Sequence, residues 1–284
     1  MRILLILLAF FGANGLRAAE YMVLRTGGNA PIEGLLRQPY ISGLSVIYNW
    51  SDLEPHLGQY DFSAIERDLA YVRRFDKTLM IMVRDKSFAN RPLMPVPPEL
   101  TDYVVGSPER GYLAKRWETP VNVAFRNLIL ALGARFNQEP NFRGFKTSET
   151  APGLRLPASS QRAYIGNLSA VIETMGQAFP DKDTYFYMNW GPGGMSAMTA
   201  WARAAQASGV GLGGPDIHPD VDMPSYRVFR RLKGQVPIMM DVQYSNYSHG
   251  TPEALKRFGE EDLGADVLVW LPYKGVDYTD LLAR

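Results

Sequence analysis

Residues 48–62, YNWSDLEPHLGQYDF, are the part of the chain that decides the fold. The apolar run GLSVI precedes them, and the amphipathic stretch SAIERDLAYVRRF follows them. The apolar run is typical of a buried strand, whereas the later stretch places Ile65, Leu69 and Val72 on one helical face. Asp61 stands where a helix-capping residue is expected, and the turn Leu-Glu-Pro fixes where the helix begins. The segment therefore predicts a strand, a decorated turn and a helix in succession.

The same succession repeats along the chain. Further apolar runs that are typical of buried parallel strands cover residues 21–25, 43–48, 78–83, 142–147, 184–188, 210–214, 238–242 and 267–271. Helical spacing is found at residues 62–75, 120–136, 159–179, 197–208, 225–232 and 252–258. This alternation predicts an α/β fold, a single-domain (β/α)8 TIM barrel over residues 19–284. A doubly wound open sheet is the alternative, but no glycine-rich phosphate turn follows the first strand.

Composition agrees with one globular barrel and limits the partners. The chain has 284 residues, and a barrel of this kind uses about 250. Its formal net charge is +1, so neither nucleic acid nor an anionic membrane is expected as the main partner. No cysteine is present, which excludes disulfides and thiol chemistry. The 15 Tyr, 13 Phe and 5 Trp suit a surface on which sugar rings stack, and no cofactor is expected.

The first residues predict an export signal. Arg2 precedes an apolar run over residues 3–11, and small and polar residues lead to Ala18 and Ala19. The run is too short for a comfortable membrane span, so residues 1–18 are predicted to be a signal peptide cleaved after Ala18. The mature protein would then be secreted or periplasmic without a membrane anchor. An uncleaved anchor or a buried N-terminal helix is the alternative.

Polar and aromatic residues gather where the predicted strands end, which is the face of a barrel that carries chemistry. The residues expected at this face are Asn49, Trp50, Asp85, Glu149, Asn189, Trp190, Asp216, His218, Asp241, Gln243, Trp270 and Tyr273. The long interval 87–117 follows the third strand and is expected to form a loop at the same face. The set lacks the histidine spacing of a zinc site.

Glu149 is the sharpest of these residues, because FRGFKTSETAPG places it where an apolar strand meets a turn. A partly desolvated carboxylic acid can keep its proton near neutral pH and donate it to a glycosidic oxygen. The alternative is a surface glutamate that caps the turn.

Asp241 follows a very apolar run, and strand alternation places it on the same face as Gln243. A carboxylate in such a strand needs a partner or a function, since burying a lone charge is costly. It is either a second catalytic carboxylate or the partner of a neighbouring Lys or Arg. Asp216 and His218 could orient a nucleophile, bind a sugar hydroxyl or form an ordinary rim hydrogen bond, and with Asp220 they could hold a metal.

Two long segments resemble known enzymes. NWSDLEPHLGQYDFSAIERDLAYVRRFDKTLMIMV resembles the second βα unit of (β/α)8 glycoside hydrolases, the group of cellulases, β-mannanases and bacterial β-galactosidase barrels. RWETPVNVAFRNLILALGARFNQEPNFRGFKTSE resembles the stretch that leads to their fourth strand. The resemblance implies an acid/base role for Glu149 and matches Trp270 to the tryptophan that ends the eighth strand. It also shows two departures: Ser148 replaces the usual Asn, and Asp241 or Gln243 stands where a nucleophilic Glu is usual.

The sequence thus predicts a secreted glycoside hydrolase with Glu149 as acid/base, Asp241 as the partner carboxylate and the remaining strand-end residues as carbohydrate contacts. Carboxyls about 5 Å apart would indicate a retaining reaction, and a gap of roughly 6.5–9.5 Å an inverting one. One alternative is a carbohydrate-binding barrel without catalysis that uses Trp50, Trp190 and Trp270. A weaker alternative is a metal-dependent hydrolase centred on Asp216 and His218.

Overall fold

The computed structural model describes residues 18–24, 30–89 and 92–283, and its centre is a closed barrel of parallel strands. The strands of the barrel, in order around it, are β1 (Ala19–Leu24), β2 (Ile41–Asn49), β3 (Thr78–Arg84), β6 (Phe142–Thr147), β7 (Asp183–Tyr187), β8 (Gly211–Gly214), β9 (Ile238–Val242) and β10 (Val267–Trp270). The pairing of β10 with β1 closes the ring. The predicted (β/α)8 barrel is therefore confirmed, and the open sheet is excluded.

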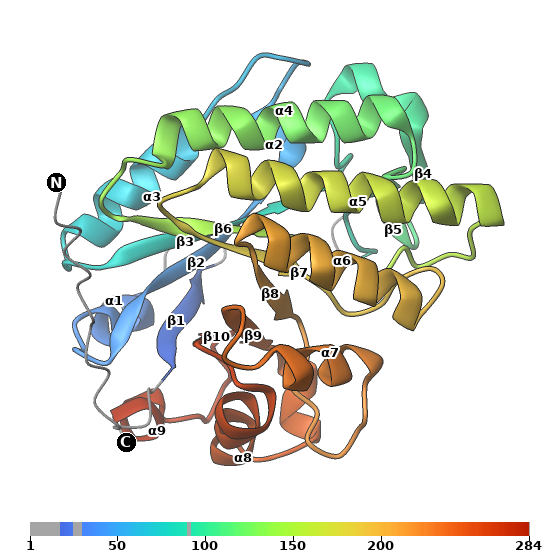
Figure 1. Ribbon diagram of the computed structural model, residues 1–284. Coiled ribbons are helices and arrows are strands. Elements are labelled where there is room, and N and C mark those ends of the chain that lie inside the picture. Colours follow the sequence, from blue (N-terminus) through green and yellow to red (C-terminus); the bar gives the residue numbers. More distant parts are fainter. Residues whose placement is uncertain (1–17, 25–29, 90–91, 284) are drawn as a thin grey trace, which may run out of the picture.

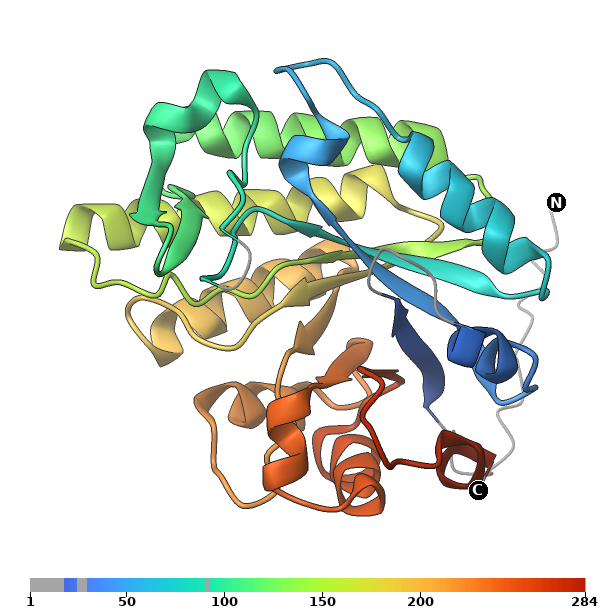
Figure 2. The ribbon, with the colours of Figure 1, turned by 180° about the vertical axis from the view of Figure 1, so that it is seen from behind.

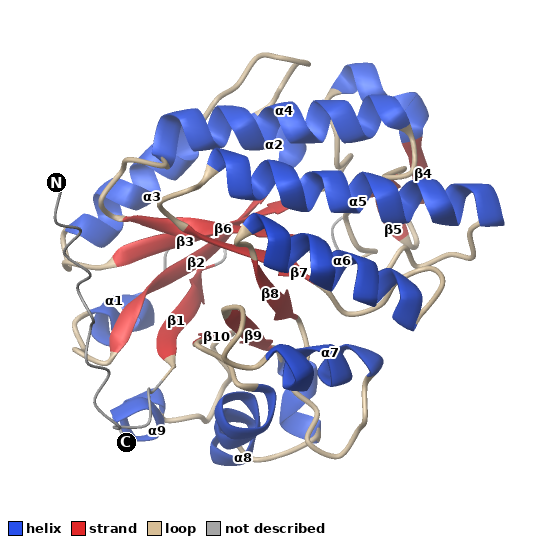
Figure 3. Cartoon of the chain, viewed as in Figure 1, coloured by secondary structure: helices blue, strands red, loops and turns tan. Residues whose placement is uncertain are grey.

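Helices cover the outside of the barrel (Figures 1 and 3). They are α1 (Ala30–Leu36), the short α2 (Trp50–Leu53), α3 (Ser63–Arg73), α4 (Thr119–Phe136), α5 (Ala158–Ala178), α6 (Met195–Ser208), α7 (Pro224–Leu232), α8 (Pro252–Arg257) and α9 (Tyr278–Ala283). The long helices α4, α5 and α6 lie side by side along one flank (Figure 1). The helix predicted over residues 252–258 continues as one π-helical turn, η3 (Phe258–Leu263).

Two apolar layers result from strand alternation. The side chains inside the barrel include Tyr21, Met80, Met82, Tyr185, Tyr187, Met239 and Val269. The larger layer fills the space between the strands and the helices and contains Met240, Val242 and Trp270. Each strand-end residue therefore faces either the barrel interior or the helices, and its parity along the strand decides which.

The interval 87–117, predicted as a loop, has structure of its own. It contains a 3-10 turn, η1 (Pro98–Tyr103), and an antiparallel hairpin of β4 (Val104–Ser107) and β5 (Gly111–Ala114). The hairpin extends the end of β3, since Ser87 N donates to Tyr112 O at 2.7 Å and Ala114 N donates to Asp85 O at 3.1 Å. Figure 2 shows it beside the ends of α4 and α5. The prediction of an irregular loop was wrong, although its place at the mouth of the barrel was right.

Of the predicted signal peptide only Ala18 belongs to the described residues, so the leader stays a prediction. Among the helices that the structure describes, none has the length and apolar character needed to cross a membrane.

Candidate active site

Glu149 follows β6 at the mouth of the barrel and is held by two neighbours. Lys86 forms an ion pair with its Oε1, and Asn189 Nδ2 donates to its Oε2 at 2.5 Å. The side chain remains 23% exposed. The sequence predicted a partly desolvated carboxylic acid here, whereas the structure shows a side chain in an ion pair that still reaches the mouth. Lys86 itself is buried, and this burial lowers its pKa although Glu149 offsets part of the effect.

Asn189 is fixed in the orientation that Glu149 needs. Its Oδ1 accepts from Trp190 N at 2.8 Å and from Ala151 N at 3.1 Å. Because these main-chain donors hold the carbonyl end of the amide, the NH2 end faces Glu149. Asn189 therefore orients the carboxylate, as a residue predicted at the site should be able to do.

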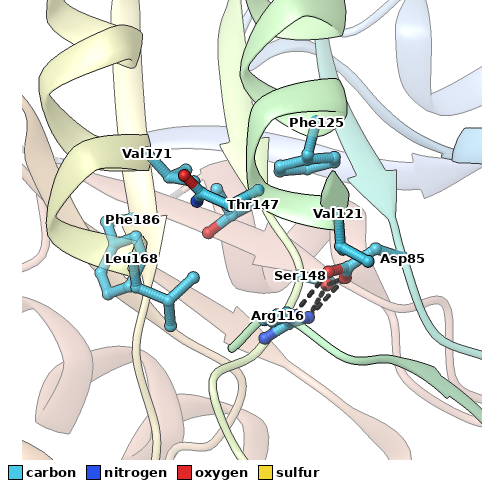
Figure 4. Close-up of a pocket in the computed structure, with 10 residues that line it drawn as sticks. Asp85, Arg116, Val121, Phe125, Thr147, Ser148, Leu168, Val171 and Phe186 are labelled. Carbon is cyan, nitrogen blue, oxygen red and sulfur yellow. Dashed lines mark hydrogen bonds and ion pairs between the residues drawn. The ribbon is translucent and has the colours of Figure 1, made fainter. Parts of the chain in front are cut away.

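Arg116 bonds the main-chain carbonyl of Glu149, and Figure 4 shows Arg116 beside its other partners Asp85 and Ser148. Its guanidinium forms a bidentate ion pair with Asp85, donates to Ser148 Oγ at 2.6 Å and reaches Glu149 O at 2.8 Å. Burial raises the pKa of Asp85, but Arg116 and Ser148 more than offset it and hold that pKa below its usual value. Asp85 is almost fully buried, so its predicted contact with substrate is wrong: it anchors Arg116.

The cavity beside this network is small and mostly apolar. Its volume is about 20 Å³, and Val121, Phe125 and Val171 contribute to its lining (Figure 4). Such a volume accommodates about one water molecule, so it is no place for a sugar.

Asp216 follows β8, and its pKa is raised above that of an ordinary aspartate. Burial raises its pKa to about 6, and the negative charges of Glu149 and Asp241 add to the effect, while a hydrogen bond from Asn246 opposes it. Asp216 thus holds its proton close to neutral pH while Glu149 remains paired with a cation. The sequence had assigned these properties to Glu149.

A group of polar side chains surrounds Asp216. His218 Nε2 lies 4.0 Å from Asp216 Oδ1 and 2.9 Å from Asn246 Nδ2. Its ring stacks on His249 at 3.9 Å, and burial, together with the charge of that histidine, lowers the pKa of His218. Gln243 N donates to Asn246 Oδ1 at 2.6 Å, and Gln243 caps the short helix η2 (Tyr244–Ser248). Gln243 therefore supports the site through Asn246.

The metal alternative required Asp216, His218 and Asp220 to act together. Asp220 Oδ1 instead lies 2.7 Å from His249 Nδ1. Throughout residues 18–24, 30–89 and 92–283, no three or more His, Asp and Glu side chains are grouped so that they could hold a metal ion.

Asp241 faces the barrel interior, where Lys146 Nζ contacts both of its carboxylate oxygens at 2.8 and 2.9 Å. Both side chains are buried, and burial lowers the pKa of Lys146 while Asp241 offsets part of that change. This is the ion-paired alternative for Asp241. The geometry disfavours Asp241 as the second catalytic carboxylate, because both oxygens are occupied within the protein.

Two predicted sugar contacts are wrong. Trp270 lies between β10 and the helices, fully buried, and its Nε1 donates to Glu20 Oε2 at 2.7 Å. Trp50 is also fully buried and donates to Glu54 Oε2 at 2.5 Å. Both tryptophans therefore belong to the outer core and do not reach the mouth.

Other predicted contacts lie at the surface. Asn49 donates from Nδ2 to Asp52 Oδ2 at 2.7 Å on the rim. Trp190 is 51% exposed and Tyr273 is 42% exposed, so both can offer ring surface to a ligand.

Two lysines at the site were missed. Lys86 stands next to Asp85 in MVRDKSF, one residue beyond the predicted strand-end residue. Lys146 occupies the inward-facing position of FRGFKT, where strand alternation alone indicated a buried charge in need of a partner. Both signals were present in the sequence.

Comparisons with known proteins found solved structures with a similar fold. No family model matches the chain, and no curated protein matches it in sequence. An endo-β-1,4-xylanase from Gloeophyllum trabeum superposes with a TM-score of 0.56 at 12% identity, covering 90% of this chain and 84% of that one. Xylanase 10B from Thermotoga petrophila RKU-1, in complex with xylobiose, gives 0.58 at 10% identity, with coverages of 91% and 83%.

A β-galactosidase from Bacillus circulans sp. alkalophilus has a TM-score of 0.60 at 11% identity, and the match covers 93% of this chain but 51% of that enzyme. At these identities the likeness shows the fold. The resemblance to (β/α)8 glycoside hydrolases is therefore confirmed at the level of the barrel.

Proposed function

We propose that this protein is a glycoside hydrolase in which Asp216 is the general acid and Glu149 the partner carboxylate. One observation carries the proposal: two carboxyls at the mouth differ in environment, since Lys86 pairs with Glu149 while burial and the charge of Glu149 raise the pKa of Asp216 to about 6. A carboxyl that keeps its proton near neutral pH is suited to act as a general acid, and an ion-paired carboxylate near it can act as its partner. The roles differ from those predicted by sequence, where Glu149 was the acid and Asp241 its partner.

The chemistry follows from the two protonation states. Asp216 donates its proton to the glycosidic oxygen as the bond between that oxygen and the anomeric carbon breaks, so the leaving sugar departs as an alcohol. Glu149 either attacks the anomeric carbon or removes a proton from an attacking water. If Glu149 attacks, a water then breaks the bond between Glu149 and the anomeric carbon, and Asp216 recovers its proton from that water. If Glu149 takes the proton of the attacking water, Glu149 afterwards releases that proton to solvent and Asp216 takes one up from solvent. The anomeric configuration of the first product distinguishes the two routes.

Trp190 supports a carbohydrate substrate. Its exposed indole belongs to an open pocket of about 650 Å³, which Pro152, Leu154 and Gln161 also line. The pocket begins two residues after Glu149 in the chain, and the Thr150 hydroxyl donates to Trp190 O at 2.5 Å. A sugar ring stacked on Trp190 would lie against the segment that follows Glu149.

The xylanases and β-galactosidases that share the fold support the same class of reaction. We further propose that the protein is exported, with residues 1–18 as its leader, and acts on a poly- or oligosaccharide outside the cytoplasm.

The test is hydrolysis of a polysaccharide panel by the wild type, Glu149→Gln and Asp216→Asn. We expect each variant to lose about 10²–10⁴-fold in kcat on the substrate that the wild type cleaves. Glu66→Gln is the matched control, because Glu66 pairs with Arg135 on the exposed face of α3. Retention of full turnover by either site variant would remove that residue from the mechanism.

A second candidate function is carbohydrate binding without cleavage. The ion pair between Asp241 and Lys146 favours it, because β9 then presents no unpaired carboxylate to a ligand. Saturable binding of an oligosaccharide with no product formed over a long incubation would support this candidate against the hydrolase.

A further inference from the structure

Three tyrosines gather on the segments that follow β9 and β10. Tyr273 stacks on Tyr247 with ring centroids 4.4 Å apart and planes 15° apart, and Tyr244 lies 5.9 Å from Tyr273. Tyr244 and Tyr273 are 47% and 42% exposed. We call these three residues the tyrosine platform. Its rings present apolar faces with polar tips, the surface that a pyranose ring prefers.

Buried hydrogen bonds hold the tyrosine platform in place. Tyr278 OH lies 2.8 Å from Tyr247 OH, accepts from Tyr273 N at 2.9 Å and donates to Leu271 O at 3.2 Å. The Tyr278 hydroxyl thus ties the Tyr247 side chain and the Tyr273 main chain to the end of β10. A surface organised before a ligand arrives loses little conformational entropy on binding, so this platform has the construction of a binding site.

The cavity at the platform contains groups that suit sugar hydroxyls. It has a volume of about 700 Å³, and Tyr247 and Tyr273 line it together with Glu253, Lys274, Asp277 and Asp280. Three carboxylates against one ammonium make this an acidic surrounding. Such a surrounding repels a uronic acid and favours an uncharged sugar, whose hydroxyls can donate to carboxylates.

The platform and the candidate active site share the short helix η2. Tyr244 and Tyr247 belong to η2, the same short helix from which Asn246 reaches His218 and Asp216. Through Asn246 this helix supports Asp216, and through Tyr244 and Tyr247 it contributes two rings to the platform. A chain of sugars bound beside Asp216 can continue onto the platform.

We propose that the tyrosine platform is a distal subsite that stacks an uncharged sugar residue of the substrate, remote from the bond that is cleaved. This inference rests on the proposed function and specifies its substrate: a neutral oligosaccharide or polysaccharide long enough to span both places. We expect a disaccharide held at the carboxylates to contact the platform less than a longer oligosaccharide does.

The test is direct binding, measured by calorimetry with β-1,4-linked pentasaccharides of xylose, glucose, mannose and galactose and with the matching disaccharides. For the pentasaccharide that the wild type binds, we expect Tyr273→Ala to weaken affinity about tenfold, the loss of one aromatic stacking contact. Tyr273→Phe keeps the ring and should retain the affinity. The loss in Tyr273→Ala should be clearly smaller for the disaccharide.

Tyr60→Ala is the matched control, because Tyr60 is a partly exposed tyrosine on the turn between α2 and α3, outside the platform. Thermal unfolding of each variant verifies the fold. Equal pentasaccharide affinity in Tyr273→Ala and the wild type, or binding of no pentasaccharide at all, would overturn the subsite. Binding that depends on Tyr273 without any hydrolysis would uphold the subsite and reject the proposed catalysis, whereas hydrolysis with no effect of Tyr273 would do the reverse.

Discussion

Burial and the charge of Glu149 raise the pKa of Asp216 to about 6, against 3.8 for an ordinary aspartate. Folding therefore disfavours the ionised form. Below about pH 4 the carboxyl of Asp216 is protonated in both the folded and the unfolded protein and does not affect stability. Between about pH 4 and 6 the free energy of unfolding falls as pH rises. Above that window the full cost is present, about 3 kcal/mol for this shift. A residue suited to donate a proton thus destabilises the neutral-pH protein.

Asp216→Asn should relieve that cost. We expect the substitution to raise the free energy of unfolding at pH 7.5 by about 1–3 kcal/mol more than it does at pH 4, where the carboxyl is already neutral. Urea unfolding at both pH values measures the difference. An effect of equal size at the two pH values would mean that Asp216 does not titrate in this window.

The same carboxyl sets the pH dependence of the proposed reaction. Because Asp216 must be protonated to act, kcat/KM should decrease as pH rises through about 6, as expected for loss of an essential acid in the free enzyme. The residual activity of Asp216→Asn should lack this limb. A rate profile in which both proteins share the limb would assign it to another group.

The sequence identified Glu149 correctly as a mouth carboxylate, because an apolar strand meeting a Pro-Gly turn is a local pattern. The proton affinity of Asp216 could not be predicted in that way, since it depends on burial and on a charge that another strand supplies. Asp241 was given a catalytic role for a similar reason: its partner Lys146 lies on β6, and only the barrel brings the two together.

At the scale of an element, the hairpin of β4 and β5 positions Lys86, the ion-pair partner of Glu149. Lys86 pairs with Leu113 of β5 in an isolated bridge, and Ser87 is bonded to Tyr112 through both its main chain and its hydroxyl. Gly111 has φ 85°, and a Cβ there would overlap the main chain of Ser87 and Phe88. The hairpin can lie this close to β3 only because residue 111 is a glycine.

Gly111→Ala should push the hairpin away and loosen Lys86 from Glu149. We expect kcat/KM to fall at least tenfold, with a loss of about 1–3 kcal/mol in the free energy of unfolding from backbone strain. Steady-state kinetics and urea unfolding measure the two effects. Gly166→Ala is the control: that glycine lies in α5 with no neighbour within 4 Å of a new Cβ, so the substitution should be neutral or slightly stabilising. Similar losses in both variants would contradict the role of the hairpin.

Most strands and helices could be predicted because their apolar periodicity is local, as at residues 62–75 and 120–136. The hairpin could not, since its strands of four residues are too short for periodicity and take their stability from pairing with residues 85–87. Its glycine turn, SPERG, was the one local signal.

At the scale of the whole molecule, the first and last strands are joined through side chains as well as main chain. Trp270 on β10 donates to Glu20 on β1, and Glu20 also pairs with Lys256 at 3.4 Å. Burial raises the pKa of Glu20 to about 6, while the bond from Trp270 opposes that shift. The indole therefore stabilises the closed barrel.

Trp270→Phe should weaken the side-chain link between β10 and β1, and so lower stability, without changing KM. Removing the indole donor leaves a buried carboxylate short of one hydrogen bond, which we expect to cost about 1–3 kcal/mol in the free energy of unfolding. Urea unfolding and steady-state kinetics provide the comparison. A large rise in KM with unchanged stability would return Trp270 to the sugar site that its sequence position suggested.

The alternation of strands and helices was enough to predict the barrel, because eight such units in one undivided chain have few ways to bury all their strands. It was not enough to assign the tryptophans. Trp270 ends β10 as expected, but its parity along the strand turns it toward the helices, and a shift of one residue would reverse this. Trp50 instead begins α2, one residue after β2 ends.

The bond from Gln243 N to Asn246 Oδ1 has a consequence for proton supply. It leaves the amide NH2 of Asn246 facing His218 Nε2, and an NH2 group can only donate. His218 is therefore the neutral tautomer with its hydrogen on Nδ1, and the nitrogen 4.0 Å from Asp216 carries none. In the proposed reaction, His218 Nε2 has no proton to transfer to Asp216. We therefore expect water at the mouth of the barrel to return the proton to Asp216 after each turnover.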